Sequence, residues 1–190
     1  MNTKTFLLRA SALSFVACIV AAEPLRDAVY RGAVKELKPP ASVVGAQWVS
    51  AYGLVIEDFD DAQSHPEEER AAVQGLKAQL EPVGVRKAAD FSFRVPDDPS
   101  RFVTLRVFVF KSPEWCAHWW EKKYRHEGWE KLYKPVEGVN YLAVDIVGSP
   151  KRAVAIGNVW MTCHSLKDAN DHLAVIGACV EKLRESTKGE

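Results

Sequence analysis

The chain of 190 residues carries 25 lysines and arginines against 25 aspartates and glutamates, so its formal net charge at pH 7 is zero. A balanced charge without a basic cluster argues against nucleic acid as a partner, because that binding draws most of its affinity from neutralised phosphates. The length suits one domain with a single hydrophobic core.

The first 22 residues have the layout of an export signal. Lys4 and Arg9 give a positively charged start, an apolar stretch follows over residues 10–20, and small side chains precede a cut after Ala22. The apolar run is much shorter than the roughly 20 residues that span a bilayer. We therefore predict a signal peptide over residues 1–22 and a periplasmic or extracellular location.

A second interpretation of the leader is lipidation at Cys18. Residues 15–18 are Phe-Val-Ala-Cys, which resembles a bacterial lipobox with phenylalanine in place of the usual leucine. The cysteine would then become the lipid-bearing first residue and tether the protein to a membrane. Contact with a membrane is expected only in that case.

After the leader, the sequence predicts an arm and then one domain. The domain covers residues 41–190. Apolar residues at helical spacing from Leu25 to Leu37 predict an amino-terminal helical arm over residues 23–40, which a Pro-Pro pair ends. Valine, isoleucine and aromatic residues then favour a strand at residues 53–56.

A helix is predicted next, after a proline and three successive glutamates. Pro66 is preset for a first helical turn, and the glutamates lie beside the positive end of the helix dipole. Val73, Leu76 and Leu80 form the apolar stripe, and Pro82 ends the helix.

Residues 85–95 and 102–111 predict a β-hairpin, because apolar and polar side chains alternate along both segments. One face of the first segment carries Val85, Ala89, Phe91, Phe93 and Val95. One face of the second segment likewise carries Val103, Leu105, Val107 and Val109. The prolines and aspartates of residues 96–100 favour the turn between them.

A helix, three strands and a closing helix complete the chain. They are predicted at residues 112–126, 129–133, 140–146, 152–163 and 167–185. The closing helix buries Ile176, Val180 and Leu183. Gly157 and Asn158 are interpreted as a bulge or a close backbone approach within the third of these strands.

Strands and helices mix here without a regular β-α-β alternation. We therefore predict the α+β class: a mainly antiparallel sheet of about five or six strands with two or three helices packed on one face. If the three later strands form a meander, the strand ending at Cys163 runs parallel to the strand ending at Lys111. Both helices that follow those strands would then start at the same end of the sheet.

Three cysteines remain after the leader, and an exported protein can form disulfides. The parallel arrangement brings Cys116, at the start of its helix, and Cys163, at the end of its strand, to one end of the molecule. We predict a disulfide between these two residues. Cys179 lies several turns into the closing helix and is predicted to be a buried free thiol. Three independent buried thiols are the alternative.

A metal site was weighed against the disulfide. Cys116, His118, Cys163 and His164 are ligand types for zinc or copper. Residues two apart on a helix, and neighbours on a strand, point in very different directions, which argues against a shared ion. The same geometry argues against a catalytic cysteine and histidine pair.

A calcium site was also considered for the acidic stretch. Asp58, Asp60 and Glu69 fall at three positions of an EF-hand loop, but a ligand and the turn glycine are missing between them. We predict no metal and no cofactor for this chain.

The segment 115–124, Trp-Cys-Ala-His-Trp-Trp-Glu-Lys-Lys-Tyr, is unusually aromatic. On a helical wheel its large side chains cover roughly 180 degrees, whereas an ordinary apolar stripe needs about 100 degrees. One interpretation is that they are all core. The other is that Trp115, Trp119 and Tyr124 form a surface that stacks on a ligand or on a partner's apolar patch.

The sequence contains none of the common catalytic or phosphate-binding motifs. We predict an exported non-catalytic domain that binds a small molecule or an envelope protein through the aromatic helix surface. The alternative is a hydrolase or redox enzyme whose site is assembled from residues far apart in the sequence.

Overall fold

The computed structural model describes residues 29–124, 133–136, 139–144, 151–165 and 169–187. The predicted signal peptide and Cys18 lie outside the described residues. Within the described part, every helix is too short or too polar to cross a lipid bilayer.

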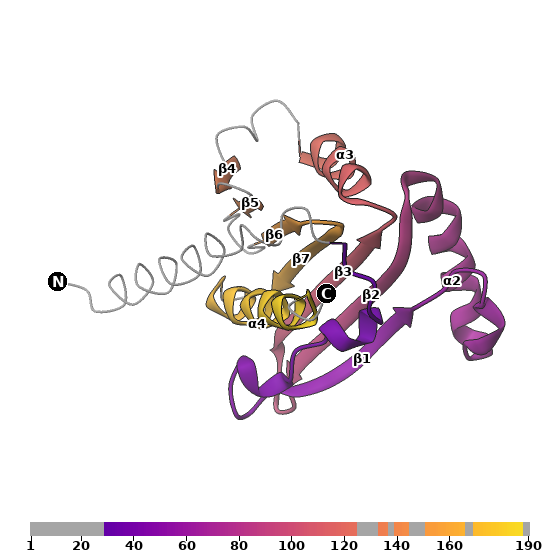
Figure 1. Cartoon of the computed structure of the whole chain (residues 1–190). Helices are drawn as coiled ribbons and strands as arrows, with labels where there is room; N and C mark the ends of the chain where they lie inside the picture. Colours follow the sequence, from indigo (N-terminus) through magenta and orange to yellow (C-terminus); the bar gives the residue numbers. More distant parts are fainter. Residues whose placement is uncertain (1–28, 125–132, 137–138, 145–150, 166–168, 188–190) are drawn as a thin grey trace.

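Within the described residues, one seven-stranded sheet has the order β1-β2-β3-β7-β6-β5-β4 (Figure 1). The strands are β1 Val49–Ile56, β2 Val85–Val95, β3 Asp98–Phe110, β4 Tyr133–Val136, β5 Val139–Val144, β6 Lys151–Ile156 and β7 Val159–Ser165. Each described pair of neighbouring strands is antiparallel. The predicted α+β class with a mainly antiparallel sheet is confirmed, with more strands than expected.

In the described part of the chain, three helices pack on this sheet together with short 3-10 turns. The helices are α2 Glu67–Leu80, α3 Pro113–Tyr124 and α4 Ala169–Thr187, and the 3-10 turns are η2 Val34–Leu37, η3 Ala41–Val43, η4 Ala62–Ser64 and η5 Glu81–Val83. The sequence predicted a helix after Pro66, an aromatic helix and a closing helix, and these are α2, α3 and α4. The predicted hairpin is formed by β2 and β3.

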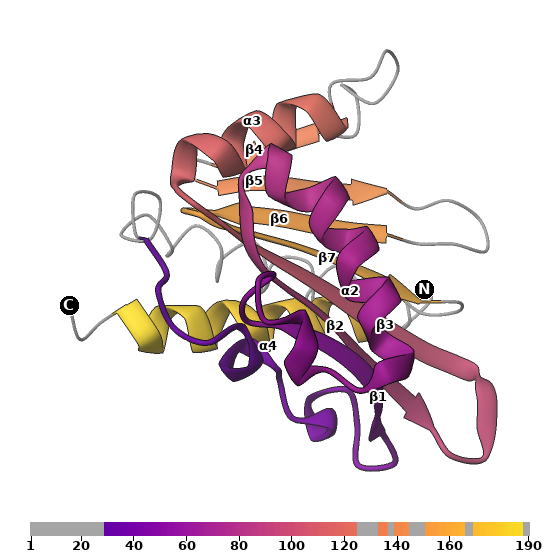
Figure 2. The same cartoon turned by 90° about the vertical axis from the view of Figure 1, so that its right-hand side faces the viewer.

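The helices cover both faces of the sheet, whereas the sequence predicted one. α4 lies on one face, which we call the α4 face, and α2 and α3 lie on the other, the α2–α3 face (Figures 1 and 2). The reason is that β3 is apolar on both sides. Val107 and Val109 pack under α4, while Phe108 and Phe110 pack under α2 and α3. A strand that is apolar on both sides must be covered on both sides.

The arm packs against the α4 face but is not the predicted helix. Tyr30, Val34 and Leu37 are buried in the cluster under α4, yet among residues 29–40 only η2 is helical. The backbone of Tyr30 is bonded elsewhere: its N–H donates to Asn158 Oδ1 at 2.7 Å, and its carbonyl accepts from Asn158 Nδ2 at 3.1 Å. These groups are therefore not available to a helix.

Residues 152–163 form two strands instead of one. Gly157 adopts a positive φ of 54 degrees, and the chain reverses at Gly157 and Asn158 between β6 and β7. Glycine at the first of two turn residues is typical of a tight hairpin. The extra reversal changes the direction of the last strand, so β7 runs antiparallel to β3 and not parallel as predicted.

β2 contains a register shift between Val85 and Lys87. Such a bulge turns the side chains beyond it to the opposite face of the sheet. Val85 therefore packs on the α2–α3 face, while Ala89 and Phe91 pack on the α4 face. The sequence had placed all three on one face.

Candidate functional site

The aromatic helix α3 is largely a core element. Trp120 and Cys116 are fully buried against the sheet. Trp119 is half-buried and packs edge-on against Phe108 at 5.9 Å and against Trp160 at 6.2 Å between ring centroids. The Lys123 ammonium lies 5.7 Å from the centroid of the Trp119 ring.

Trp115 is the exposed tryptophan of α3, with 40% of its surface accessible. Its ring lies directly on Gly84, because a Cβ placed on Gly84 would come 2.5 Å from the indole. Gly84 also has a positive φ of 87 degrees, so glycine is favoured there on two grounds. The Lys111 ammonium lies 5.5 Å from the ring centroid. Trp115 therefore has a structural role at the start of α3.

The three predicted ligand residues thus have different surroundings. Trp119 belongs to the core under α3, and Trp115 is clamped on Gly84 with part of its surface open. The side chain of Tyr124 lies outside the described part, although its backbone ends α3.

The predicted disulfide between Cys116 and Cys163 is wrong. None of the three described cysteines takes part in a disulfide. Cys116 lies in the cluster on the α2–α3 face, and Cys163 lies in the cluster on the α4 face. The sheet separates the two thiols, because Cys163 is paired with Leu105 and shares its face, which is opposite to the face on which α3 packs.

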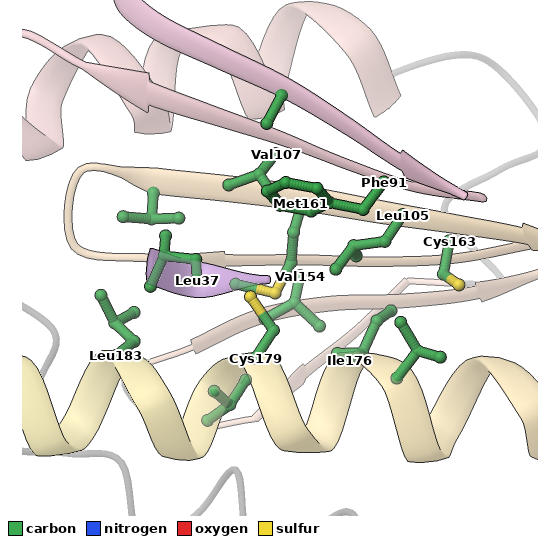
Figure 3. Close-up of a cluster of buried hydrophobic side chains, with 14 of the residues drawn as sticks. Leu37, Phe91, Leu105, Val107, Val154, Met161, Cys163, Ile176, Cys179 and Leu183 are labelled. Atoms are coloured by element: carbon green, nitrogen blue, oxygen red, sulfur yellow. The ribbon is translucent and has the colours of Figure 1, made fainter. Parts of the chain in front are cut away.

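Cys163 also lies far along the sheet from the end of β3, where the chain continues into α3 and Cys116. Cys163 faces Leu105, five positions before the end of β3 at Phe110. Five residues of strand span roughly 17 Å. Cys179 lies on the buried side of α4. It belongs to the same cluster as Cys163, and the two side chains lie apart from each other (Figure 3). Burial raises the pKa of Cys116 and of Cys179 to about 12.

The structure also separates the residues of the zinc or copper hypothesis. Cys116 and Cys163 lie on opposite faces of the sheet, and His118 is exposed on α3. Within the part of the chain that the structure describes, no three histidine, cysteine or acidic side chains gather as metal ligands would.

In the acidic stretch, a lysine occupies the place that a cation would take. Lys77 of α2 forms an ion pair and hydrogen bond with Asp60. This contact holds the pKa of Asp60 below its ordinary value. Glu69 points to Tyr52 instead, with the Tyr52 hydroxyl donating to it at 2.7 Å.

A groove crosses the first three strands on the α2–α3 face, beyond the end of α2. It is lined by Ala51, Tyr52, Arg94, Val95, Pro96 and Phe102, and we call it the hairpin groove. Its volume is about 470 Å³. Figure 2 shows the β2–β3 hairpin projecting past α2, which leaves this end of the sheet without a helix over it.

Exposed apolar side chains gather at and beside the groove. The described residues include four exposed large hydrophobic side chains, namely Val49, Tyr52, Phe102 and Trp115. Tyr52 and Phe102 line the groove, and Val49 is the β1 partner of Arg94. Arg94 in turn pairs with Phe102 on β3. Paired residues share a face, so Val49, Arg94 and Phe102 form one row across three strands.

Tyr52 is held in place by α2. Its hydroxyl donates to Glu69 Oε1, and the other carboxylate oxygen of Glu69 lies 3.3 Å from His65 Nδ1. The hydrogen bond to Glu69 raises the pKa of Tyr52 to about 12. Hydrogen bonds from Tyr52 and His65 hold the pKa of Glu69 below its usual value. The Glu69 carboxylate beside the groove is therefore ionised and already bonded.

The sequence pattern does not single out these residues. Arg94 is one of the polar residues that alternate with the apolar ones of residues 85–95, and Phe102 is the first residue of the second predicted strand. The available signal was Phe102 itself, an aromatic residue on the opposite side from Val103 and Leu105. Tyr52 joins them only through the pairing of β1 with β2 and its bond to α2.

No family model and no curated protein matches the chain. Among solved structures, the chain is similar to the extracellular domain of PknH from Mycobacterium tuberculosis, with 9% sequence identity and a TM-score of 0.48. The match covers 76% of this chain and 90% of that one. A similarity of this extent does not assign the chain to a family or a function.

Proposed function

We propose that the protein is an exported, non-catalytic binding domain whose hairpin groove receives a small molecule. The observation that carries the proposal is that two of the four exposed large apolar side chains in the described residues, Tyr52 and Phe102, line the groove, and a third, Val49, lies beside its arginine on β1. Exposed apolar side chains gathered in a concave place are typical of binding sites. The volume of about 470 Å³ is within the range of small-molecule sites.

The titratable groups beside the groove support binding over catalysis. A general acid or base works best when its pKa is near the working pH. The pKa of Tyr52 is raised to about 12, and that of Glu69 is held below its usual value. Both shifts move these groups away from neutrality.

The proposal of export rests on the leader over residues 1–22, with a charged start, an apolar run and small residues before Ala22. On the same grounds the protein acts in the periplasm or outside the cell. Lipidation at Cys18 would add a membrane anchor and leave the groove unchanged.

The aromatic helix surface is the competing site, with Trp115 as its exposed residue. An envelope protein as partner would need a contact of about 800 Å² on each side. Among the described side chains of α3, Trp115 is the exposed large apolar one, and its ring already contacts Gly84 and Lys111. We therefore favour the hairpin groove and a small molecule.

Chemical-shift mapping by NMR with a panel of small aromatic compounds tests the proposed site. We expect the ring signals of Tyr52 and Phe102 to shift on binding, and Phe102→Ala to weaken binding about tenfold, because a buried aromatic contact contributes on the order of 1.5 kcal/mol. Trp115→Ala is the matched control, with a similar exposed fraction, and should leave binding unchanged. Shifts centred on Trp115, or no binding by any compound, would contradict the proposal.

A further inference from the structure

Arg94 is the charged residue at the centre of the hairpin groove. It is exposed, and among the described residues its side chain makes no hydrogen bond or ion pair. Its two strand neighbours, Val49 and Phe102, offer it only apolar surface. A guanidinium in such a place has all its donors available to an incoming group.

Charged residues near Arg94 on this face, namely Asp90, Arg106 and Glu69, have partners. Four residues before Arg94 on β2, Asp90 accepts two hydrogen bonds of 2.7 Å from Arg106. Glu69 is bonded to both Tyr52 and His65. Arg106 and Arg94 therefore differ sharply although both lie on the α2–α3 face, because the first has a carboxylate partner and the second has none. The residues that line the groove carry a single charge, which is positive.

The rings beside Arg94 restrict the rest of the ligand. Tyr52 is 67% exposed and Phe102 is 37% exposed, so both rings can contact an apolar group. The Tyr52 hydroxyl donates its single O–H hydrogen bond to Glu69, so it has no donor left for a ligand. Arg94 is then the charged donor in the groove, and a guanidinium binds carboxylate, phosphate or sulfonate oxygens two at a time.

From these contacts we infer that the hairpin groove binds a small organic anion: a carboxylate, phosphate or sulfonate bonded to Arg94 and attached to an apolar or aromatic body that packs on Tyr52 and Phe102. This inference rests on the proposed function, because it names the ligand class of the same groove. The anionic group and the apolar body are both required.

Titration with an isosteric pair tests the charge. Naphthalene-2-carboxylate and its neutral carboxamide have nearly the same shape and differ in charge. We expect the carboxylate to bind the purified protein at least about tenfold more tightly than the amide, the discrimination that a charge-assisted hydrogen bond supplies. The preference should weaken as salt is raised, because Arg94 is exposed and its field is screened.

Variants of two arginines on β2 test whether Arg94 causes the preference for the carboxylate. Arg94→Gln should remove the preference for the carboxylate and leave binding of the amide unchanged, whereas Arg94→Lys should retain part of it. The matched control is Arg86→Gln, which removes a charge from an exposed arginine of the same strand, outside the groove. Circular dichroism confirms that each variant is folded.

The outcomes separate this inference from the proposed function. If carboxylate and amide bind equally well and Phe102→Ala weakens both, the groove is a binding site and the anion inference is overturned. If acetate or inorganic phosphate binds as tightly as naphthalene-2-carboxylate, the apolar body has no role and the inference is also overturned. If neither naphthalene probe binds at millimolar concentration, both proposals fail.

Discussion

Asn158 joins three parts of the chain through one buried side chain. It is 2% exposed, and it bonds to the N–H and the carbonyl of Tyr30 and to the carbonyl of Phe110. The backbone carbonyl of Asn158 accepts a hydrogen bond from the Phe110 N–H at 2.8 Å. An asparagine side chain has both a donor and an acceptor, as a peptide group has, and so it can pair with a backbone as a strand would. The arm is attached to the sheet in this way.

We predict that Asn158→Ala lowers the free energy of unfolding by about 3 kcal/mol, because each buried backbone group left without a partner costs about 1–3 kcal/mol. Asn158→Asp should also destabilise, since a carboxylate cannot donate to the two carbonyls. Urea unfolding followed by fluorescence measures both effects. Ser92→Ala is a control, because its hydroxyl contact to Thr104 is long, at 3.5 Å. An Asn158→Ala protein as stable as this control would contradict the assigned role.

At the scale of elements, α2 and α4 are attached to the sheet very differently. In α4, the described residues Val175, Ile176, Cys179, Val180 and Leu183 are all buried. In α2, only Val73 and Leu80 are buried, and Leu76 is half-buried. The remaining contacts of α2 include the pair of Lys77 with Asp60 and the bond of Tyr52 to Glu69, which are exposed. Exposed ion pairs add little stability.

We predict that the amides of α2 exchange with deuterium much faster than those of the middle of α4. Few buried apolar contacts allow a segment to open locally without global unfolding. Hydrogen exchange with mass spectrometry measures the rates at peptide resolution, and the central strands β2 and β3 serve as the slow reference. Equal protection of α2 and α4 would show that the exposed contacts hold α2 more firmly than we infer.

Several elements could be predicted from local patterns. Alternation over residues 85–110 gave the hairpin, and the stripe through Ile176, Val180 and Leu183 gave α4. Gly157 and Asn158 were misjudged, because a bulge and a tight turn have the same residue preferences and only pairing distinguishes them. That single error reversed β7 and produced the wrong disulfide.

The candidate site shows why function was harder to predict than the elements. Tyr52 and Phe102 are fifty positions apart, and the groove exists because β1 pairs with β2 at a shifted register and α2 stops short of the hairpin. Neither fact has a local signature. The aromatic segment attracted attention because its composition is unusual, but a rich aromatic composition is as typical of a core as of a binding surface.

On the scale of the whole molecule, the described domain is stabilised by packing on two faces of one sheet and by no described cross-link. The two clusters lie on either side of β3, and each of the three described cysteines is a buried thiol of one of them, outside any disulfide. Stability therefore comes from burial of apolar surface, with no contribution from a disulfide.

We predict that a reducing agent leaves the melting temperature unchanged. In the native protein, Cys116, Cys163 and Cys179 should react slowly with a thiol reagent, because burial keeps them from solvent and holds the thiols of Cys116 and Cys179 protonated. After denaturation without reductant all three should be alkylated at once, as mass spectrometry can count. A mass lower by two protons in the denatured protein would reveal a disulfide and contradict the structure.

The bond between the arm and the sheet also sets an order of assembly. Tyr30 and Asn158 are 128 positions apart, and contacts across so long a loop form late because closing the loop costs entropy. The arm needs the β6–β7 turn in place before its backbone has a partner, and Val34 and Leu37 share their cluster with α4. The arm is synthesised before the sheet, and we expect it to dock last. Until then its apolar side chains stay open to proteases and to other chains, so the newly made protein is most vulnerable at its beginning.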